Sequence, residues 1–383
     1  MKQILEYFDP VSLDRPPFEE YLLHKQSFCR HIDIHTPDQI PEGQYNIALI
    51  GLVDERGSFA SKVSLAADVI RNQLYLLNFF HKKPKIVDLG NLKTGPSVSD
   101  TYYAIRDICL ELIPKETLPI FFGGTQDATF GMYLAFESLK KKYRLTTIDY
   151  RLDCNFESYQ TLHFLNYLNQ IILNQHHLFE LYNIGHQQCF EIPTNSDLLE
   201  NLFYENIRLG LVRNNIASVE PYLRDTHILS IDISSVKHAD APGQIVSSPN
   251  GFSAEEICQM ARYAGVSDNA KVLGIFNYLP IKDMGEVTAS LIAQVIWYFI
   301  EGYTYRLNEN PQVDSSVFQQ FFVTLNEEHH LKFYKSKVSQ RWWTEVPSKS
   351  GDNVYIACSE NDYLLALKNE IPDRWIKVFK RLN

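Results

Sequence analysis

Three aspartates stand at the ends of two short apolar runs, where carboxylates can do chemistry. The run 228–233 contains Asp232 near its end, and the run 144–149 ends on Asp149, with Asp153 four residues later. Runs of this length and composition are typical of buried strands. An acid at the carboxyl end of such a strand usually faces a site, where carboxylates bind hard divalent cations or transfer protons. These acids are therefore our first candidates for functional residues.

Two cations in the same stretches offer a simpler role for the three acids. Arg151 lies between Asp149 and Asp153, and Lys237 follows Asp232 by five residues. We expect hydrogen-bonded ion pairs with these cations, because the cations are part of the motifs themselves. A single-metal site made of the three carboxylates is the alternative.

Other chemically capable side chains are less informative. His163, His186 and His238 can line the same crevice, but a hydrogen-bonded structural role is the more common one for histidines in such places. The pair Gly123-Gly124 is not followed by Lys and Ser or Thr, as a phosphate-binding loop requires. No serine stands in a G-x-S-x-G turn, so a serine acyl hydrolase finds no support.

The elements that must position these residues alternate along the chain. From residue 46 onwards, short apolar runs alternate with longer amphipathic segments, which predicts β-α units and a mostly parallel sheet between two layers of helices. We predict eight strands, at 46–52, 85–89, 118–123, 144–149, 181–185, 206–210, 227–233 and 271–277. The predicted helices are 64–80, 99–113, 128–141, 160–174, 253–264 and 285–303.

Composition divides the chain into three parts. Residues 1–45 contain five prolines, which predicts an N-terminal arm of turns and short helices. Residues 46–306 form the predicted α/β domain. Residues 307–383 are neutral, with ten Lys and Arg against ten Asp and Glu. This C-terminal extension is rich in aromatic residues, which disordered tails are not, so we expect it to pack against the domain or against a partner.

Composition also excludes several classes of function. A net charge of −10 argues against a broad binding surface for nucleic acid or for an anionic membrane, since both need clustered Lys and Arg. The longest uncharged apolar stretch, 287–300, is shorter than the ~20 residues of a membrane span, and acids near Met1 interrupt any signal peptide. The six cysteines are scattered, which indicates free thiols. We therefore expect a cytoplasmic protein with no membrane span and no nucleic-acid partner.

Several stretches resemble one family. Residues 229–243 fit the ureohydrolase strand end S-F-D-V-D-x-x-D-P-x-x-A-P-G in the frame around Asp232 and in the ending Ala241-Pro242-Gly243. Further similar motifs occur in the right order over residues 46–305, at 47–51, 66–71, 86–90 and 251–256. The chain is thus similar to arginase, agmatinase and formimidoylglutamase. The resemblance implies an arginase-like, three-layer α/β/α fold.

The resemblance also implies where a binuclear Mn²⁺ site would lie. Family members bind two Mn²⁺ ions through a His of G-G-D-H-S, through Asp, His and Asp of D-A-H-x-D, and through two Asp of D-x-D. Three of the six ligand positions match the family, namely Asp149, Asp153 and Asp232. The other three do not, and they are Gln126, Arg151 and Ser234. A guanidinium cannot coordinate a metal, so we do not expect an intact pair of Mn²⁺ ions.

Positions beside the ligands depart from the family as well. Asp127 follows Gln126, Lys237-His238 stand at the family's Asp-Pro pair, and Asn277 stands at a Glu that follows the last core strand. Together with His163 and His186, these residues complete our list of pocket candidates.

From this pattern we predict a ureohydrolase-fold pseudoenzyme that binds no cofactor and works by binding or assembly, with an unknown protein partner or by self-association. The alternative is an active formimidoylglutamase-like or arginase-like hydrolase of linear amidines, with Mn²⁺ in an atypical site. We further expect Arg151 to replace the metals as the internal counter-charge and to bridge the acids. Its removal from a dry site would cost about 3–5 kcal/mol.

Overall fold

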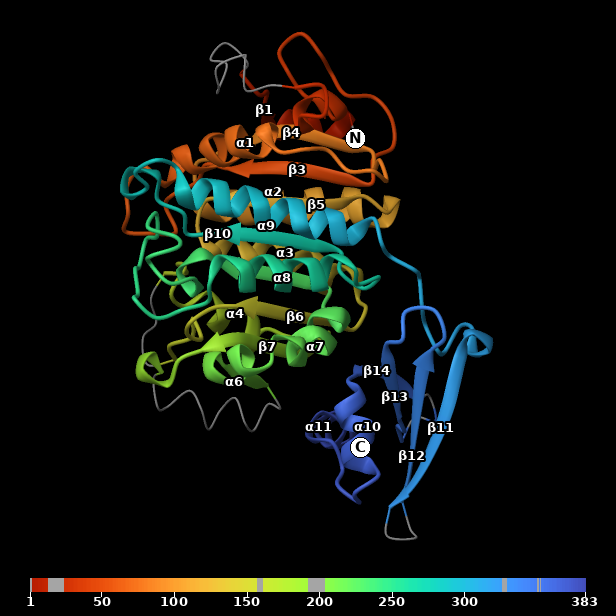
Figure 1. Cartoon of the computed structure of the whole chain (residues 1–383). Helices are drawn as coiled ribbons and strands as arrows, with labels where there is room; N and C mark the ends of the chain where they lie inside the picture. The colour runs from red at the N-terminus through yellow and green to blue at the C-terminus, as the bar shows by residue number, and fades with distance from the viewer. Residues whose placement is uncertain are drawn as a thin grey trace.

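The computed structural model describes residues 2–12, 24–156, 161–191, 204–325, 329–349, 351 and 353–383. A ten-stranded sheet forms the core, and a four-stranded sheet forms most of the C-terminal extension. Figure 1 shows the large sheet between helices, with the extension as a lobe beside its lower end.

All eight predicted strands are present in the large sheet, and each is parallel to its neighbours among the eight. Their spatial order is β4-β3-β5-β10-β9-β6-β7-β8. They are β3 (Ile47–Leu52), β4 (Ile86–Leu92), β5 (Leu118–Gly123), β6 (Tyr143–Ile148), β7 (Leu178–His186), β8 (Glu205–Arg208), β9 (Ile228–Asp232) and β10 (Val272–Phe276). The short apolar runs are buried on both faces, as strands covered by two helical layers must be.

The N-terminal arm adds two short strands that the sequence did not predict. β1 (Phe8–Asp9) pairs antiparallel with β4, and β2 (Asp33–Ile34) pairs parallel with it. Both pair with the free side of β4, where unpaired backbone groups would otherwise be exposed. The arm is therefore part of the sheet, in addition to its turns and short helices.

Helices cover both faces of the sheet. The cluster under one face contains side chains of α1 (Ala66–Leu76), α8 (Ala254–Gly265) and α9 (Val287–Tyr303). The cluster under the other contains side chains of α2 (Val98–Leu112), α3 (Thr129–Leu139) and α4 (Tyr167–Leu173). The six predicted helices are thus present, although α4 is shorter than the prediction. Two six-residue helices, α6 (Leu209–Asn214) and α7 (Glu220–Asp225), were not predicted.

The C-terminal extension folds as an antiparallel sheet with two helices. Its strands follow one another in the order β11-β12-β13-β14, and their bounds are β11 (Phe318–Leu325), β12 (His329–Ser336), β13 (Trp342–Val346) and β14 (Val354–Cys358). The helices are α10 (Glu360–Ala366) and α11 (Asp373–Leu382). Side chains of β13, β14 and α11 pack on Phe179 of β7 in one apolar cluster. The aromatic content therefore did indicate burial.

None of the described helices is both long enough and apolar enough to cross a membrane. All six cysteines are free thiols, in agreement with their scattered positions.

Candidate metal centre at the carboxyl edge of the sheet

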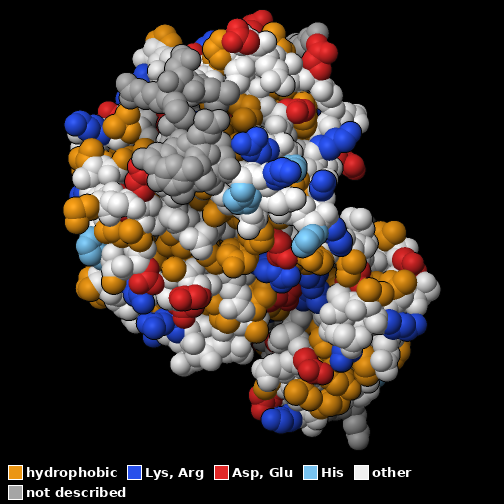
Figure 2. All heavy atoms as spheres, turned by 45° about the horizontal axis from the view of Figure 1, so that its top comes forward, with side chains coloured by type: hydrophobic (Ala, Val, Ile, Leu, Met, Phe, Trp, Pro, Cys, Tyr) orange, Lys and Arg blue, Asp and Glu red, His pale blue; other side chains and the backbone are white. Residues whose placement is uncertain are grey.

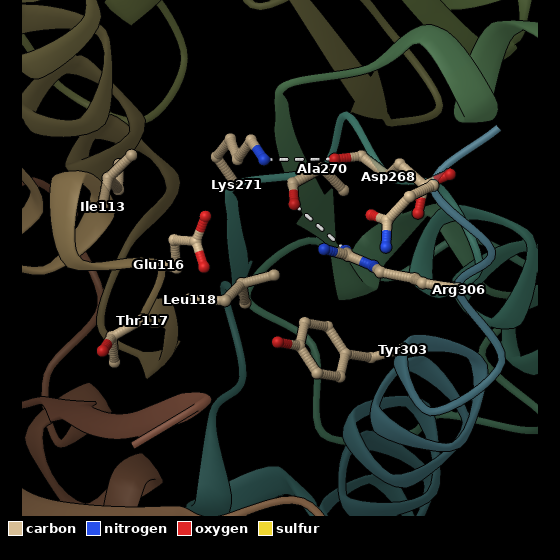
Figure 3. Close-up of a pocket in the computed structure, with 10 residues that line it drawn as sticks. Ile113, Glu116, Thr117, Leu118, Asp268, Ala270, Lys271, Tyr303 and Arg306 are labelled. Carbon is tan, nitrogen blue, oxygen red and sulfur yellow. Dashed lines mark hydrogen bonds between the residues drawn. The ribbon is translucent and has the colours of Figure 1, made fainter. Parts of the chain in front are cut away.

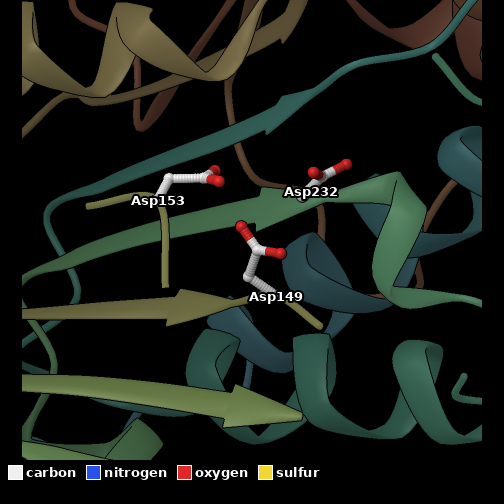
Figure 4. A group of neighbouring side chains, drawn as sticks. All are labelled: Asp149, Asp153 and Asp232. Carbon is white, nitrogen blue, oxygen red and sulfur yellow. The ribbon is translucent and has the colours of Figure 1, made fainter. Parts of the chain in front are cut away.

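Four neighbouring strands bring the candidate residues to one point of the sheet's carboxyl edge. Asp149 follows β6, and Asp232 is the last residue of β9, which lies next to β6. Asn277 follows β10 and Gln126 follows β5, the next two strands across the sheet. Asp153 returns to the same point from the loop after β6. Figure 4 shows the three carboxyl groups turned toward one another above the strand ends.

The three acids form a compact and buried group. One carboxylate oxygen of each lies within 4.8 Å of the others. Asp149, Asp153 and Asp232 are only 1%, 2% and 2% exposed. Burial raises all three pKa values, and mutual repulsion raises that of Asp149 further. The pKa of Asp149 lies well above the usual range, and that of Asp153 is raised to about 7.

Arg151 neutralises one of these acids rather than bridging them. Its Nε atom lies 2.8 Å from Asp153 Oδ1, and its backbone N–H donates to Asp149 Oδ1 at 3.2 Å. Asp232 instead accepts a hydrogen bond of 2.7 Å from the backbone N–H of Ser234. The side chain of Arg151 is 25% exposed. The expectation of a buried guanidinium that joins all three acids is therefore corrected to a single ion pair at the rim.

Gln126 supplies the contact that we had assigned to Arg151. In the amide orientation that satisfies every neighbour, its Nε2 donates to Asp149 Oδ2 at 3.0 Å and to Asp153 Oδ2 at 3.2 Å. Its Oε1 accepts from Tyr167 and from Ser230, both at 3.3 Å. The amide thus lies between two carboxylates, with all its hydrogen-bonding capacity in use. It is completely buried.

Three of the remaining candidates lie near the acids. Asn277 is buried, adopts a positive φ of 67°, and accepts from the backbone N–H of Gln126 at 3.1 Å. His163 lines a cavity of about 470 Å³, and burial together with the nearby charge of Arg151 lowers its pKa. Ser234 contributes its backbone N–H to Asp232, while its buried hydroxyl has no partner among the described residues.

Four further candidates serve elsewhere. Lys237 pairs with Asp240 at 3.3 Å, so the expected ion pair with the acids is wrong: the 3₁₀ turn Ile233–Ser235 carries the chain away from them. His238 is exposed. The other two are His186, whose Nε2 lies 3.4 Å from Glu191 Oε2, and Asp127, which accepts a hydrogen bond of 2.5 Å from the Tyr102 hydroxyl.

The family model for the arginase family matches residues 45–301, which is well over half of the chain. The chain belongs to the arginase family. A comparison with curated protein sequences finds no match.

Solved structures of the family share this fold. Formiminoglutamase of Trypanosoma cruzi, crystallised with Mn²⁺, is 17% identical with a TM-score of 0.64, over 69% of this chain and 95% of that one. Formimidoylglutamase of Bacillus subtilis is 16% identical, also with a TM-score of 0.64, over 70% and 90%. Agmatine ureohydrolase of Thermoplasma volcanium is 17% identical with a TM-score of 0.57, over 74% and 97%. Each covers an arginase-family core and leaves about a quarter or more of this chain unmatched.

The residues present do not fit a pair of Mn²⁺ ions. Three carboxylates remain of the six ligands that the arginase-family motifs imply. The amide nitrogen of Gln126, a donor that cannot coordinate, points between two of them. The guanidinium of Arg151 pairs with Asp153, one of these two acids. Mn²⁺ prefers carboxylate and imidazole ligands, and no described histidine joins the three acids as a ligand.

Two residues of this arginase-family site escaped sequence analysis. Ser230 and Tyr167 both contact the Gln126 amide. Ser230 stands two residues before Asp232, and side chains two apart on a strand share a face, so its position carried a usable signal. Tyr167 reaches the site from the first turn of α4, which only the tertiary fold reveals.

Proposed function

We propose that this arginase-family chain has lost binuclear manganese binding and the hydrolysis of C–N bonds, and that it works by binding or assembly. The observation that carries the proposal is the amide of Gln126, which donates to Asp149 and Asp153 where the family motif has a metal-binding His. A hydrogen-bond donor in this place substitutes for a cation without recruiting one.

The chemistry of the relatives explains why these substitutions matter. A bound metal ion would lower the pKa of a water molecule to near neutrality and so supply a hydroxide for the hydrolysis. The Gln126 amide cannot do so, and Arg151, although charged, is committed to Asp153. The surviving acids have raised pKa values and are held by donors, so they form a structural network rather than a hydrolytic centre.

A binding role is supported by a cavity among the loops that follow β3 and β6. This cavity of about 470 Å³ at the same edge of the sheet is lined by Phe59, His163 and Phe164 among others. The volume falls within the usual range for small-molecule pockets. Phe59 is 74% exposed, an unusual exposure for a large apolar side chain.

The first experiment measures metal and activity together. The protein is purified in Mn²⁺-containing buffer and desalted, its metal content is determined by elemental analysis, and urea and formamide release is assayed with arginine, agmatine and formimidoylglutamate. We expect no stoichiometric metal and no product, with an active arginase assayed in parallel. Two bound Mn²⁺ ions per chain would overturn the proposal, as would turnover that a chelator abolishes.

Binding of a single Mn²⁺ ion is a separate outcome. Three buried carboxylates within 4.8 Å of one another resemble a site for one hard cation. A chain with one bound Mn²⁺ and measurable hydrolysis would support the alternative, an active hydrolase with an atypical metal site.

The second experiment rebuilds the family ligands. The triple variant Gln126→His, Arg151→His, Ser234→Asp restores imidazole and carboxylate at the three departures, and we expect it to gain Mn²⁺ binding that wild type lacks. The same triple variant with Asp232→Asn lacks one acid and should bind weakly. If wild type and the triple variant bind Mn²⁺ equally well, Gln126 and Arg151 do not block the site.

A further inference from the structure

A second cavity lies at the opposite, amino edge of the large sheet, between the core and the C-terminal extension. It has a volume of about 350 Å³. Its wall combines residues from the start of β6, from α7, from the loop before β10, from the linker 308–312 and from β13 and β14. Figure 2 shows basic and acidic side chains gathered where the two lobes meet.

The wall contains buried polar atoms that have no partner among the described residues. They are Arg224 Nη1, Asp268 Oδ1 and Glu309 Oε2. Each of these side chains is fixed through another atom. Arg224 Nη2 donates to Cys358 O at 3.0 Å, Asp268 Oδ2 accepts from the Glu309 backbone at 3.1 Å, and Glu309 Oε1 accepts from Ser336. Donors and acceptors are thus held in place but do not pair with each other.

Arg341 adds a second cation to the same wall. Glu220 is shared between two guanidiniums, at 3.1 Å from Arg224 Nε and at 3.7 Å from Arg341 Nε. The side chains of Arg224 and Arg341 are only 5% and 22% exposed. Burial and the nearby charge of Arg224 lower the pKa of Arg341. The two poorly hydrated cations share one carboxylate at ion-pair distance, while Glu309 and Asp268 act on Arg341 from further away, so the wall offers both signs of charge to a ligand.

The neighbouring cavity provides an internal contrast. It has a volume of about 280 Å³ and shares Asp268 and Asn308 with the first. Its cations are occupied: Arg306 Nε and Nη2 donate to Gly265 O and Ala270 O at 2.9 and 3.0 Å, and Lys271 Nζ donates to Asp268 O at 3.1 Å. Figure 3 shows two of these hydrogen bonds to backbone oxygens. The cations of this neighbouring wall are therefore held by backbone oxygens, unlike Arg224 Nη1.

We propose that the cavity between the core and the extension binds a small zwitterion of the α-amino acid class. Its carboxylate pairs with Arg224 and Arg341, and its ammonium group pairs with Asp268 and Glu309. Trp343, whose ring already stacks on Arg224 at 4.4 Å, borders the same space and offers an apolar surface to the ligand. Because both lobes contribute to the wall, the ligand joins the extension to the core. This inference is independent of the proposed loss of hydrolysis.

Single-charge analogues separate a zwitterion site from simpler ones. Full-length protein is titrated by calorimetry with L-alanine and L-glutamate, and with acetate and methylamine at matched ionic strength. We expect saturable binding of the amino acids only. Equal binding of acetate would show a plain anion site, and absence of binding at millimolar concentrations would show that water alone satisfies the wall. Either result overturns the proposal.

Variants locate the binding to this cavity. Glu309→Gln keeps side-chain size, and Arg341→Gln removes the guanidinium; each should weaken amino-acid binding roughly tenfold or more, since each removes a charge-assisted contact. Lys335→Gln is the matched control, because Lys335 also makes a 3.7 Å ion pair in the extension sheet and is 25% exposed, but does not line the cavity. Unchanged affinity in both cavity variants would place any observed binding elsewhere.

A second readout does not depend on affinity. The linker residues Asn308, Glu309 and Asn310 form part of the cavity wall. Bound amino acid should therefore slow proteolysis within 307–316 in wild type and leave Arg341→Gln unaffected. Cleavage at the same rate with and without L-glutamate would contradict the proposed link between the lobes.

Discussion

The two edges of the large sheet bury acids of equal exposure under opposite electrostatic conditions. At the carboxyl edge, Asp149 and Asp153 have raised pKa values. At the amino edge, Asp225 is 2% exposed, and burial alone would raise its pKa as well. Arg144 and Arg374, together with the backbone N–H of Ala357, outweigh burial there and lower it.

The difference shows that burial alone does not decide whether an acid is protonated. The number of cations near each carboxylate decides it. Asp225 accepts from Arg374 Nη2 at 2.6 Å and from the Ala357 backbone at 2.9 Å, and two further arginines lie near it. Three acids at the other edge share one rim arginine. The amino edge therefore stabilises the ionised form of its buried acid, whereas the carboxyl edge has more carboxylates than cations to balance them.

The largest expected effect comes from breaking the amino edge. Arg374→Ala removes the ion pair between α11 and α7 and leaves Asp225 under-compensated in a buried place. Loss of one partner of a buried pair costs about 3–5 kcal/mol. Because the folded pKa of Asp225 is lowered, this stabilisation is present above its unfolded pKa and is lost only as pH falls through the folded one. Thermal unfolding near neutral pH measures the loss.

Limited proteolysis shows which part of the chain is loosened when the ion pair between Arg374 and Asp225 is removed. In wild type we expect the first cleavage near 307–316 and a resistant extension, whereas Arg374→Ala should expose the extension to digestion. Lys377→Ala is the control, since Lys377 lies one turn further along α11 in an exposed pair with Glu205. Similar losses in both variants would mean that the buried pair has no special weight.

A smaller effect is expected at the carboxyl edge. Arg151→Ala removes one ion pair of a quarter-exposed guanidinium, so we expect a loss of about 1–3 kcal/mol rather than the cost of a fully buried charge. The folded pKa of Asp153 is raised to about 7, so its stabilising contribution is present below the unfolded pKa and is lost as pH rises through 7. Without Arg151 that loss continues to higher pH.

The measurement is the thermal midpoint of wild type and Arg151→Ala at about pH 5 and about pH 8. The gap between them should widen at the higher pH. Adding Asp153→Asn to the variant removes the titrating group and should flatten this dependence. A midpoint for Arg151→Ala equal to that of wild type at the higher pH would show that the acids need no counter-charge.

The smallest effect is expected for Lys237→Ala. The structure pairs Lys237 with Asp240, and both are partly exposed, so the change should cost no more than about 0.5 kcal/mol, the usual range for surface pairs. Its unfolding should show the same pH dependence as wild type. A pH-dependent loss like that of Arg151→Ala would mean that Lys237 acts as a counter-charge for the three acids. The two edges would then not differ in their supply of cations.

Local pattern was sufficient for the core of the fold. Most of the eight parallel strands are short and largely apolar, and such runs leave a strong signal, whereas β8 (Glu205–Arg208) is polar and only partly buried. β1 and β2 have two residues each and were missed, because no periodicity fits in two residues. α6 and α7 were missed because six residues make less than two helical turns, too few to show the helical period. Aromatic content predicted that the extension is buried, but its antiparallel sheet depends on pairing that no single segment reveals.

The candidate site divides in the same way. Strand ends placed Asp149 and Asp232 correctly, because parallel strands end at a common edge. We predicted an ion pair between Lys237 and the acids because Lys237 is close to Asp232 in sequence. The turn between them directs the chain away from the acids, so the pair does not form. The contact between Arg374 and Asp225 joins residues 149 positions apart, and nothing local marks either residue as a partner of the other.

The position of Gln126 has a consequence for any attempt to rebuild the site. Its amide contacts two acids on one side and two hydroxyls on the other, so four neighbours are arranged around it. Gln126→His alone would give up some of these bonds and would still leave Arg151 and Ser234 in place. A single substitution therefore loses hydrogen bonds without completing a ligand set, and the ligands of the family motifs can be restored only by several changes together.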